Sequence, residues 1–336
     1  MTKIAINGFG RIGRPTLRRI FEKHPELEVK AINDLTDTKT LAHLLKYDSA
    51  YGIYDREIKS DNSHLIINKT KIKCLSEKDP ANLPWEELGI DVVLECTGFF
   101  RNFESAKKHL EAGAKKVIIS APSKSPEISH FILGVNQEKY DNKKDNIVSM
   151  ASCTTNCLAP VASIIHKEFE IKSGLMTTIH SYTNDQRLLD SPHKDLRRAR
   201  SAALSMAPTT TGAAIAVIKI IPELKGKING LAVRIPSPVV SLIDFVAKVK
   251  KETTVKEVNS IFKKASEQDN FKGILDTEDN LLVSADYKGN SFSSIIDTAS
   301  TMVQGGNLVK ILAWYDNEYG YACRLAELAE FIGKKL

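Results

Sequence analysis

Three glycines near the N-terminus constrain the fold of this chain more than any other feature. Gly8, Gly10 and Gly13 directly follow the apolar residues 3–7 and open a helical pattern over residues 11–23. This G-x-G-x-x-G spacing between a strand and a helix is typical of a dinucleotide-binding turn. Glycine permits the tight turn, the close approach of the backbone to a pyrophosphate and close packing of the helix on the strand. The free N–H groups at the start of the helix are then expected to bind phosphate.

An acidic residue supports this interpretation. Asp34 follows the second strand pattern, residues 29–33, about 20 residues after Gly13, where a carboxylate is expected to bind the adenosine ribose hydroxyls. A carboxylate at this place repels a 2′-phosphate, so the sequence favours NAD over NADP. The glycines alone could serve packing in a strand–helix turn. Here, however, the strand, the glycines, the helix and the acidic residue all occur in the order and spacing of a dinucleotide-binding unit.

The first part of the chain continues as an alternation of strands and helices. Apolar runs at residues 90–96 and 117–120 and a helical pattern at 105–112 extend it. Such an alternation predicts a parallel, doubly wound sheet. We therefore expect an N-terminal Rossmann dinucleotide-binding domain over residues 1–151, completed by a C-terminal amphipathic helix at 318–336.

The pattern changes after Ser152. A helix is predicted over residues 153–169, and the apolar runs that follow are longer, with several joined by turn residues alone. These features predict an α+β catalytic domain over residues 152–317 with a largely antiparallel or mixed sheet. It contains a long, arginine-rich segment, residues 181–206, and a loop of that length in a compact domain is usually functional. The longer apolar runs of this domain are residues 175–179, 228–235, 239–249, 292–297 and 308–315.

Length and composition narrow the functional class. A chain of 336 residues is long enough for two domains. No apolar run approaches the ~20 residues of a membrane span, and the N-terminus lacks signal-peptide character. The net charge of +6 suits anionic small molecules and falls short of a nucleic-acid-binding surface. Five cysteines without a framework spacing indicate a reducing compartment, so we expect a cytoplasmic protein.

One cysteine is placed for chemistry. Cys153 opens the predicted helix 153–169, where the positive end of the helix dipole favours a thiolate. Cys157, one turn later, is expected to serve packing, because no further Cys or His nearby completes a metal site. The remaining cysteines fall in strand or helix patterns and are expected to be small core residues. They are Cys74, Cys96 and Cys323.

A nucleophilic thiol needs a base, and His180 is the candidate. It ends the predicted strand 175–179, at the edge of the second sheet. A histidine at a strand end is more often structural than catalytic, and its position alone does not show that it meets Cys153. Both interpretations remain open on this ground.

Several segments together resemble a known family. The chain is similar along its whole length to the phosphorylating glyceraldehyde-3-phosphate dehydrogenases. The block Ala-Ser-Cys-Thr-Thr-Asn-Cys at residues 151–157 is highly specific to that family and its near relatives. The other matching segments are residues 7–13, 178–186, 195–200, 208–214 and 314–318.

The resemblance implies an activity and a cofactor site. It implies NAD-dependent oxidation of D-glyceraldehyde 3-phosphate to 1,3-bisphosphoglycerate, with Cys153 as the nucleophile and His180 as its activating acid/base. It implies that residues 181–206 are the S-loop, which packs between subunits of a homotetramer. The positions matching cofactor contacts are Gly8, Gly10, Arg11, Ile12, Gly13, Asp34, Lys78, Thr97, Gly98, Ser120 and Asn317.

The resemblance also implies a site for two anions, the phosphate of the substrate and inorganic phosphate. Hydroxyl groups, a backbone N–H and arginines suit such anions. Of the three arginines at 197, 198 and 200, only Arg198 is expected to meet substrate. The matching positions are Ser152, Thr154, Thr183, Arg198, Thr211, Gly212 and Arg234.

A few positions depart from the usual pattern of the family. Lys78 stands where arginine is common, which keeps the charge but loses planar stacking near adenine. Ile215 replaces a common lysine, and Val239 a common asparagine. In the S-loop, Pro192 fits the NAD-type pattern, while Ser191 supports it less. None of these changes removes a catalytic atom.

Three alternatives are weighed against this interpretation. An erythrose-4-phosphate dehydrogenase shares the nucleophile and cofactor, but the segments at 181–185 and 208–212 favour the triose enzyme. A secondary RNA-binding role would need an aromatic and basic surface motif, which the sequence lacks. A NAD-binding protein without catalysis is disfavoured by the presence of Cys153, His180 and Arg234.

Overall fold

The computed structural model describes residues 1–336, which form two units. The first unit comprises residues 1–131, 138–151 and 322–336, and the second comprises 132–137 and 152–321. Each is described by itself.

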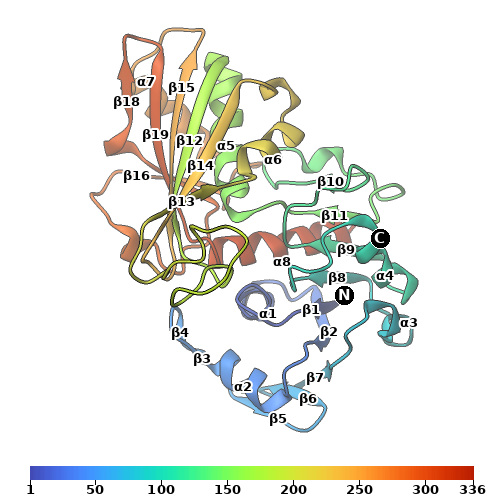
Figure 1. Ribbon diagram of the computed structural model, residues 1–336. Coiled ribbons are helices and arrows are strands. Elements are labelled where there is room, and N and C mark those ends of the chain that lie inside the picture. Colours follow the sequence, from blue (N-terminus) through green and yellow to red (C-terminus); the bar gives the residue numbers. More distant parts are fainter. The chain divides into compact units, whose positions relative to one another are not determined.

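A nine-stranded sheet forms the centre of the first unit, in the order β10-β11-β9-β8-β1-β2-β7-β6-β5 (Figure 1). In this order, every pair of neighbouring strands from β10 through β1 to β7 is parallel, as the alternation of strands and helices predicted. β6 is antiparallel to both β7 and β5, an edge that the sequence did not reveal. The strands are β1 Thr2–Asn7, β2 Leu27–Asn33, β5 Ile58–Ser60, β6 His64–Ile67, β7 Thr70–Leu75, β8 Val92–Glu95, β9 Lys116–Ile119, β10 Ser129–His130 and β11 Ile147–Ser149.

The strand order places β1 beside both β2 and β8, so the chain reverses its direction of progress at β1. In open parallel sheets a ligand binds at such a reversal, beyond the carboxyl ends of the strands. The helix that follows β1 begins at Gly13, two residues later than predicted, because residues 11 and 12 form a turn. The remaining elements are α1 Gly13–Lys23, α2 Thr38–Lys46, α3 Trp85–Leu88, α4 Phe103–Glu111, α8 Tyr319–Gly333 and the short pair β3 Tyr47–Asp48 and β4 Gly52–Ile53.

The second unit contains an eight-stranded mixed sheet, in the order β13-β14-β12-β15-β19-β17-β16, with β18 beside β19. β12 is parallel to β14 and β16 to β17, and the other pairs are antiparallel. The long strands β12, β14, β15 and β19 run side by side in Figure 1. The strands are β12 Ile171–Ser181, β13 Ala207–Thr210, β14 Ile228–Ile235, β15 Ser241–Val249, β16 Leu275–Glu278, β17 Ser294–Asp297, β18 Met302–Gln304 and β19 Leu308–Tyr315.

Helix α5, Cys153–Phe169, packs on the central strands of this sheet, while α6, Ala213–Ile220, packs on β14 and α7, Val255–Ser266, on β16. Along β15 and β19 every second residue is buried and most of the intervening residues are partly exposed. One face of the sheet is therefore covered more completely than the other. Near its start α5 also holds Cys157, which is buried as predicted, with Sγ 3.6 Å from Ser294 Oγ.

Candidate active site

A cavity of about 330 Å³ lies at the carboxyl ends of β1, β2, β7 and β8. Five of the predicted cofactor residues line it, from four different strand ends: Gly8, Gly10, Asp34, Lys78 and Thr97. This is where the strand order changes direction, the expected place for a dinucleotide. Further lining residues are Asn7, Asn33, Leu35, Glu77, Cys96, Phe99 and Phe100.

The three glycines occupy positions with different demands. Gly8 has φ +91°, and a Cβ there would lie 2.7 Å from the backbone nitrogen of Thr97. A Cβ on Gly13 would lie 2.3 Å from the carbonyl oxygen of Gly8. A Cβ on Gly10 would meet nothing within 4 Å. The turn requires glycine at position 8, and the packing of the helix on the strand requires it at position 13. At position 10 the absence of a side chain leaves space for a ligand to approach the backbone of the loop. These demands fit a bound dinucleotide.

Asp34 is held at the wall of this cavity. One carboxylate oxygen accepts a hydrogen bond from the backbone N–H of Phe9 at 2.8 Å, and the other from that of Thr36 at 3.0 Å. The residue is only partly buried, so its acceptor positions are not all used by the protein. The side chain is therefore fixed beside the glycine loop, where it can accept from ribose hydroxyls.

Replacement of Asp34 by glycine is expected to relax the preference for NAD over NADP. The variant removes the negative charge that repels a 2′-phosphate, and the ratio of kcat/KM for NAD to that for NADP should fall on the order of tenfold. Steady-state rates with each cofactor measure the change. An unchanged ratio would show that Asp34 does not read the 2′ position.

Other predicted cofactor positions do not line the cavity with their side chains. Arg11 forms an ion pair with Asp48 at 2.6 Å. Ile12 is the residue before α1, and Gly98, with φ +75°, follows Thr97 in the turn after β8. Ser120 follows β9, and its hydroxyl is hydrogen-bonded to the thiol of Cys96. Any contact that Arg11 and Ile12 make with a cofactor would come from the backbone.

The expected core role of Cys96 is wrong. Cys96 lies just beyond β8, is partly exposed and lines the cavity. The apolar run at 90–96 is longer than the strand itself, so its last residue extends into the turn. Burial of the sulfur raises the pKa of the Cys96 thiol to about 12, which leaves it protonated and unreactive at neutral pH. Cys74 also differs from the expected core role, because it is only partly buried in β7.

In the second unit, the structure brings Cys153 and His180 together. Cys153 is the first residue of α5, and Ser152 caps that helix by accepting a hydrogen bond from Thr155 N–H at 3.1 Å. Cys153 Sγ lies 3.4 Å from Nε2 of His180, which is near the end of β12. The sequence left this contact open, because it depends on how α5 packs against β12.

The other side of the His180 ring faces two polar groups. Nδ1 lies 2.7 Å from the Ser181 carbonyl oxygen and 2.7 Å from a guanidinium nitrogen of Arg234. Arg234 also donates to the Ser181 carbonyl at 2.9 Å. When the proton is on Nδ1, that atom donates to the carbonyl and Nε2 is free to accept the thiol proton. The tautomer with the proton on Nε2 has Nδ1 accepting from Arg234 instead. Only the first tautomer is a base toward Cys153.

The electrostatics favour an uncharged pair at rest. Burial and the nearby Arg234 lower the pKa of His180 to about 3. Burial also raises the pKa of the Cys153 thiol, against the opposing effects of the Arg234 charge and the N–H groups of Cys153 and Thr154. The helix start was expected to favour a thiolate, but desolvation outweighs it here. The resting pair is a thiol beside a neutral imidazole.

The rate of aldehyde oxidation is therefore expected to rise with pH between about 6 and 9. The thiolate is the nucleophile, and a thiol pKa raised above its usual value keeps the thiolate fraction increasing up to the alkaline end of this range. His180 titrates near 3, so it stays neutral and available as a base throughout. The pH profile of kcat/KM for the aldehyde measures this. A maximum below pH 7 would contradict the assignment of charges.

Two predicted substrate hydroxyls are already engaged within the protein. Ser152 Oγ serves the cap of α5, and Thr154 Oγ1 lies 2.9 Å from the hydroxyl of Tyr315 in a buried position. Any contact of Thr154 with a substrate would come from its backbone. Tyr315 OH also lies 2.8 Å from Thr178 Oγ1, and its ring meets His180 edge-on at 6.0 Å between centroids. Sequence reasoning missed Tyr315, although it stands two residues before Asn317 in one of the matching segments.

Removal of the Tyr315 hydroxyl is expected to loosen this support. The Tyr315→Phe variant leaves the hydroxyls of Thr154 and Thr178 without their shared partner, which costs roughly 1–3 kcal/mol of unfolding free energy. A several-fold loss of kcat is expected to accompany it, because α5 and β12 carry the reacting pair. Urea unfolding and steady-state kinetics measure both effects, and a variant indistinguishable from the parent would refute the supporting role.

Backbone strain and a buried polar cluster fix the end of β12. Val240 has φ 69°, a left-handed conformation that costs a β-branched residue roughly 1–3 kcal/mol. Its carbonyl accepts from Ser181 Oγ at 2.7 Å, while Ser241 Oγ accepts from Ser181 N–H at 3.1 Å. Asn317 Oδ1 accepts from Ser241 Oγ at 3.0 Å and lies 3.1 Å from Ser181 Oγ. This cluster holds Ser181, whose carbonyl orients His180.

The arginine-rich segment supplies cations near the pair. Arg198 donates to Thr209 Oγ1 at 3.0 Å and forms an ion pair with Asp185, and its charge contributes to lowering the pKa of His180. Arg197 donates to the Pro208 carbonyl at 3.1 Å, and Arg200 pairs with Asp190 at 2.7 Å. Arg197 and Arg200 thus make contacts within their own neighbourhood, as expected.

The remaining predicted substrate residues lie on loops of the same unit. Gly212 precedes α6, and Thr211 Oγ1 accepts from the N–H of Ala213 at 3.2 Å. Thr183 is partly buried, two residues beyond β12. The contacts described above join Cys153, His180, Arg234 and Thr154 into one cluster, whereas Thr183, Thr211 and Gly212 are not joined to Cys153 by hydrogen bonds.

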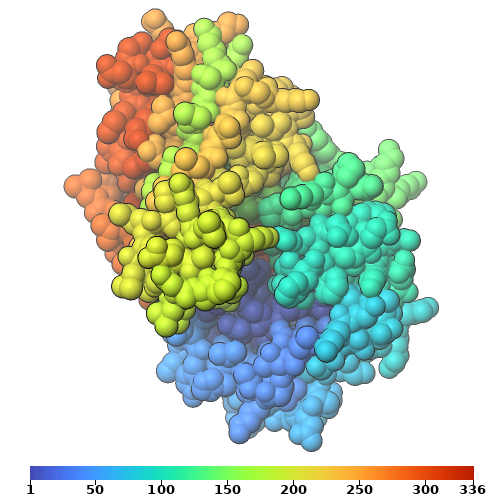
Figure 2. Space-filling model, viewed as in Figure 1, coloured from blue at the N-terminus to red at the C-terminus, as the bar shows by residue number.

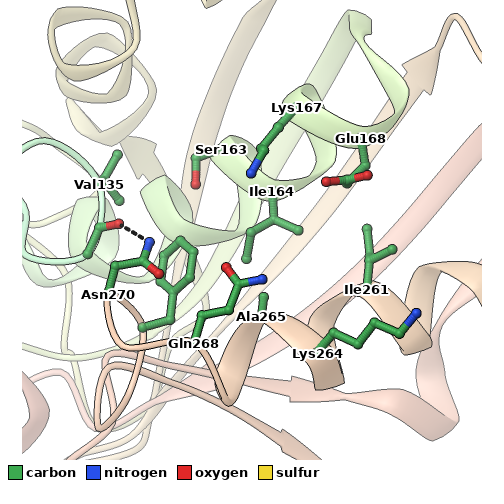
Figure 3. Close-up of a pocket in the computed structure, with 12 residues that line it drawn as sticks. Val135, Ser163, Ile164, Lys167, Glu168, Ile261, Lys264, Ala265, Gln268 and Asn270 are labelled. Carbon is green, nitrogen blue, oxygen red and sulfur yellow. Dashed lines mark hydrogen bonds between the residues drawn. The ribbon is translucent and has the colours of Figure 1, made fainter.

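A second cavity, of about 350 Å³, lies between α5 and α7 (Figure 3). Its floor is formed by apolar residues such as Ile164 and Phe271, and its rim carries Lys167, Glu168 and Lys264. No cysteine or histidine lines it.

Two further structural findings concern metals and membranes. No group of three or more His, Cys, Asp or Glu side chains is arranged to hold a metal ion. None of the helices combines the length and apolar character needed to cross a membrane.

Comparison with known proteins places the chain in a family. Residues 2–103 match the family described as glyceraldehyde 3-phosphate dehydrogenase, NAD binding domain, and residues 152–317 match its C-terminal domain. A glyceraldehyde-3-phosphate dehydrogenase of Geobacillus stearothermophilus is 56% identical over 99% of this chain and 98% of the relative. Glyceraldehyde-3-phosphate dehydrogenase 1 of Bacillus subtilis is 54% identical over the same shares, and glyceraldehyde-3-phosphate dehydrogenase 2 of Synechocystis is 50% identical over 99% of both chains. The chain belongs to the glyceraldehyde-3-phosphate dehydrogenase family, with an N-terminal Rossmann domain that binds NAD and a C-terminal catalytic domain.

Proposed function

We propose that this chain oxidises D-glyceraldehyde 3-phosphate with NAD and joins the product to inorganic phosphate, giving 1,3-bisphosphoglycerate in glycolysis and gluconeogenesis. The observation that carries the proposal is the 3.4 Å contact between Cys153 Sγ and His180 Nε2 at the start of α5. We assign NAD binding to residues 1–151 with the helix at 318–336, and catalysis to residues 152–317.

The first chemical step joins substrate to Cys153. The thiol gives its proton to His180 Nε2, and Sγ bonds to the aldehyde carbon to form a hemithioacetal. The N–H groups of Cys153 and Thr154, which face the sulfur, are placed to stabilise the developing negative oxygen, together with the protonated ring of His180.

The second step is the oxidation itself. His180 returns the proton to the hemithioacetal oxygen and then takes the hydroxyl proton as a hydride leaves the carbon. NAD, when bound, supplies the acceptor for that hydride. The carbon is left as a thioester on Cys153, and the proton on His180 passes to solvent.

The third step releases the acyl group to phosphate. An oxygen of inorganic phosphate bonds to the thioester carbon as its proton passes to His180, the sulfur leaves, and His180 gives that proton to the sulfur to restore the thiol. The substrate phosphate and the attacking phosphate both require cations. Arg234 suits this role, because it forms no ion pair with a carboxylate and its buried Nε has no hydrogen-bond partner. Arg198, Thr183, Thr211 and Gly212 are assigned to the same anions.

The test is a comparison of substrates with and without inorganic phosphate. NADH formation is followed with glyceraldehyde 3-phosphate and with erythrose 4-phosphate. Sustained turnover that prefers the triose and requires phosphate is expected. Preference for the tetrose would favour the erythrose-4-phosphate dehydrogenase, and sustained turnover without phosphate would contradict release by phosphate.

We further propose that the protein works as a cytoplasmic homotetramer whose subunits meet through the S-loop, residues 181–206. Figure 2 shows this segment in yellow-green on the surface of its unit. It exposes large apolar side chains to an unusual degree, and monomers rarely leave such groups uncovered. These are Leu188, Leu189, Leu196, Leu204 and Met206, each at least 72% exposed.

Sizing in solution is expected to give a species of four chains. Burial of the S-loop between subunits removes its apolar side chains from water, which favours association. Light scattering coupled to gel filtration measures the mass. A stable and active monomer would contradict the role assigned to the S-loop.

A further inference from the structure

A buried chain of hydrogen bonds lies beneath the NAD cavity and takes no part in the chemistry described above. Trp85 Nε1 donates to His109 Nδ1 at 3.0 Å, and His109 Nε2 lies 3.1 Å from Glu95 Oε2. Asn7 Nδ2 donates to the same oxygen at 2.6 Å. All four side chains are at most 1% exposed. Burial of such polar and charged side chains costs free energy unless each of them is fully hydrogen-bonded.

The tryptophan determines the proton position on His109. An indole N–H can only donate, so Nδ1 of His109 must be its acceptor and carries no proton. The single proton of the neutral ring is then on Nε2, from which it is donated to Glu95. The ring is further fixed by Phe100, which meets it edge-on at 6.3 Å between centroids. His109 is therefore a neutral donor of fixed orientation.

Glu95 accepts from four donors. Besides His109 and Asn7 on Oε2, the N–H of Thr97 donates to Oε1 at 2.8 Å and the hydroxyl of Thr97 donates to the same oxygen. Two donors on each oxygen fill the acceptor positions of an ionised carboxylate and leave no place for a carboxyl proton. Glu95 is thus a buried carboxylate whose hydrogen bonds are complete.

The donors belong to the ends of two neighbouring strands, β1 and β8, that both border the NAD cavity. Asn7 ends β1 and precedes Gly8, and its Oδ1 accepts from Asn33 Nδ2 at 2.7 Å. Thr97 stands in the turn after β8, and its Oγ1 accepts from the N–H of Phe99 at 3.1 Å. Asn7, Asn33, Thr97 and Phe99 all line the cavity. Through these bonds one carboxylate connects the glycine turn with the turn after β8.

We propose that Glu95, oriented by His109 and Trp85, is a positioning residue that fixes the glycine turn and the turn after β8 in the arrangement the cofactor requires. The proposal rests on the function proposed above, because it assumes that this cavity binds NAD. Glu95 does not contact the reacting atoms and acts only through Asn7 and Thr97. If Glu95 had a purely structural role, its replacement would lower the stability of the protein without changing the affinity of the folded protein for NAD.

The first test replaces Glu95 by glutamine, which keeps the size but turns an NH2 group toward donors. The dissociation constant for NAD, measured by calorimetry on the folded protein, is expected to rise roughly tenfold. KM for NAD should follow it, with a much smaller change in kcat at saturating NAD. Asp145→Asn is the matched control, because this carboxylate accepts from Ser129 Oγ at 2.8 Å and Asp141 N–H at 2.9 Å in the same unit but does not line the cavity. An unchanged NAD affinity in Glu95→Gln, or an equal loss in Asp145→Asn, would overturn the proposal.

Two further measurements test the proposal even if the Glu95→Gln variant fails to fold. Nitrogen NMR of the parent protein with labelled histidine is expected to show His109 as the Nε2–H tautomer, with Nδ1 unprotonated. Trp85→Phe, which removes only the N–H donor, is expected to weaken NAD binding about threefold. A proton on Nδ1 of His109, or a Trp85→Phe variant with parental affinity, would refute the network. Absence of NAD binding by the parent protein would instead contradict the proposed function.

Discussion

Replacement of Cys153 by serine is expected to abolish aldehyde oxidation while leaving NAD binding nearly intact. A serine hydroxyl at the start of α5 is a far weaker nucleophile than a thiolate, and the neutral His180 cannot ionise it. It also forms an ester in place of the thioester that phosphate must cleave. A loss of at least ~10³-fold in kcat is expected. NADH absorbance measures turnover, and calorimetry measures NAD binding.

Cys157→Ser is the control for this experiment. Cys157 is on the same helix but buried, and its sulfur lies near Ser294 and the carbonyl of Ala313. The substitution affects packing and is expected to lower stability while turnover persists. Retained oxidation by Cys153→Ser would refute covalent catalysis through this residue.

Replacement of His180 by asparagine is expected to produce the second-largest loss. Asparagine can still accept a hydrogen bond but cannot take up the thiol proton or the hydroxyl proton of the hemithioacetal. Loss of a general base costs typically about 10²–10⁴-fold in rate. Steady-state kinetics measure kcat, and the rate of Cys153 alkylation by iodoacetamide at neutral pH should fall as well.

His166→Asn controls for the loss of a histidine from the same unit. His166 is near the end of α5, where Nδ1 accepts from Ile171 N–H at 3.1 Å, and it does not touch Cys153. Its replacement should affect stability more than kcat. If His180→Asn lost no more activity than His166→Asn, the role of His180 as the base would be contradicted.

Local signals in the sequence predicted much of this architecture. The glycine turn, helix α5 and strands β14 and β19 occur at the predicted residues, because each is bounded by sharp turn or cap signals. The antiparallel hairpin of β5 and β6 was missed, since its strands are only 3 and 4 residues long. Such short segments carry too little periodicity to identify.

Side-chain partners were harder to predict than elements. The contact of Cys153 with His180 spans 27 residues and depends on the packing of α5 against β12. The inward direction of the Thr154 hydroxyl depends on Tyr315, which is 161 residues away. The charge on Cys153 was predicted from the helix dipole alone, whereas burial, a property of the folded chain, determines the direction of its pKa shift.

The central claim is the thioester on Cys153, and trapping it tests the claim most directly. The protein is mixed with NAD and glyceraldehyde 3-phosphate in the absence of inorganic phosphate, quenched in acid and analysed by mass spectrometry of its peptides. We expect the acyl group on the peptide that carries Cys153, together with one NADH per subunit, and its loss when phosphate is added before the quench. NADH formation without acylation of Cys153, or an adduct that phosphate does not discharge, would contradict the account.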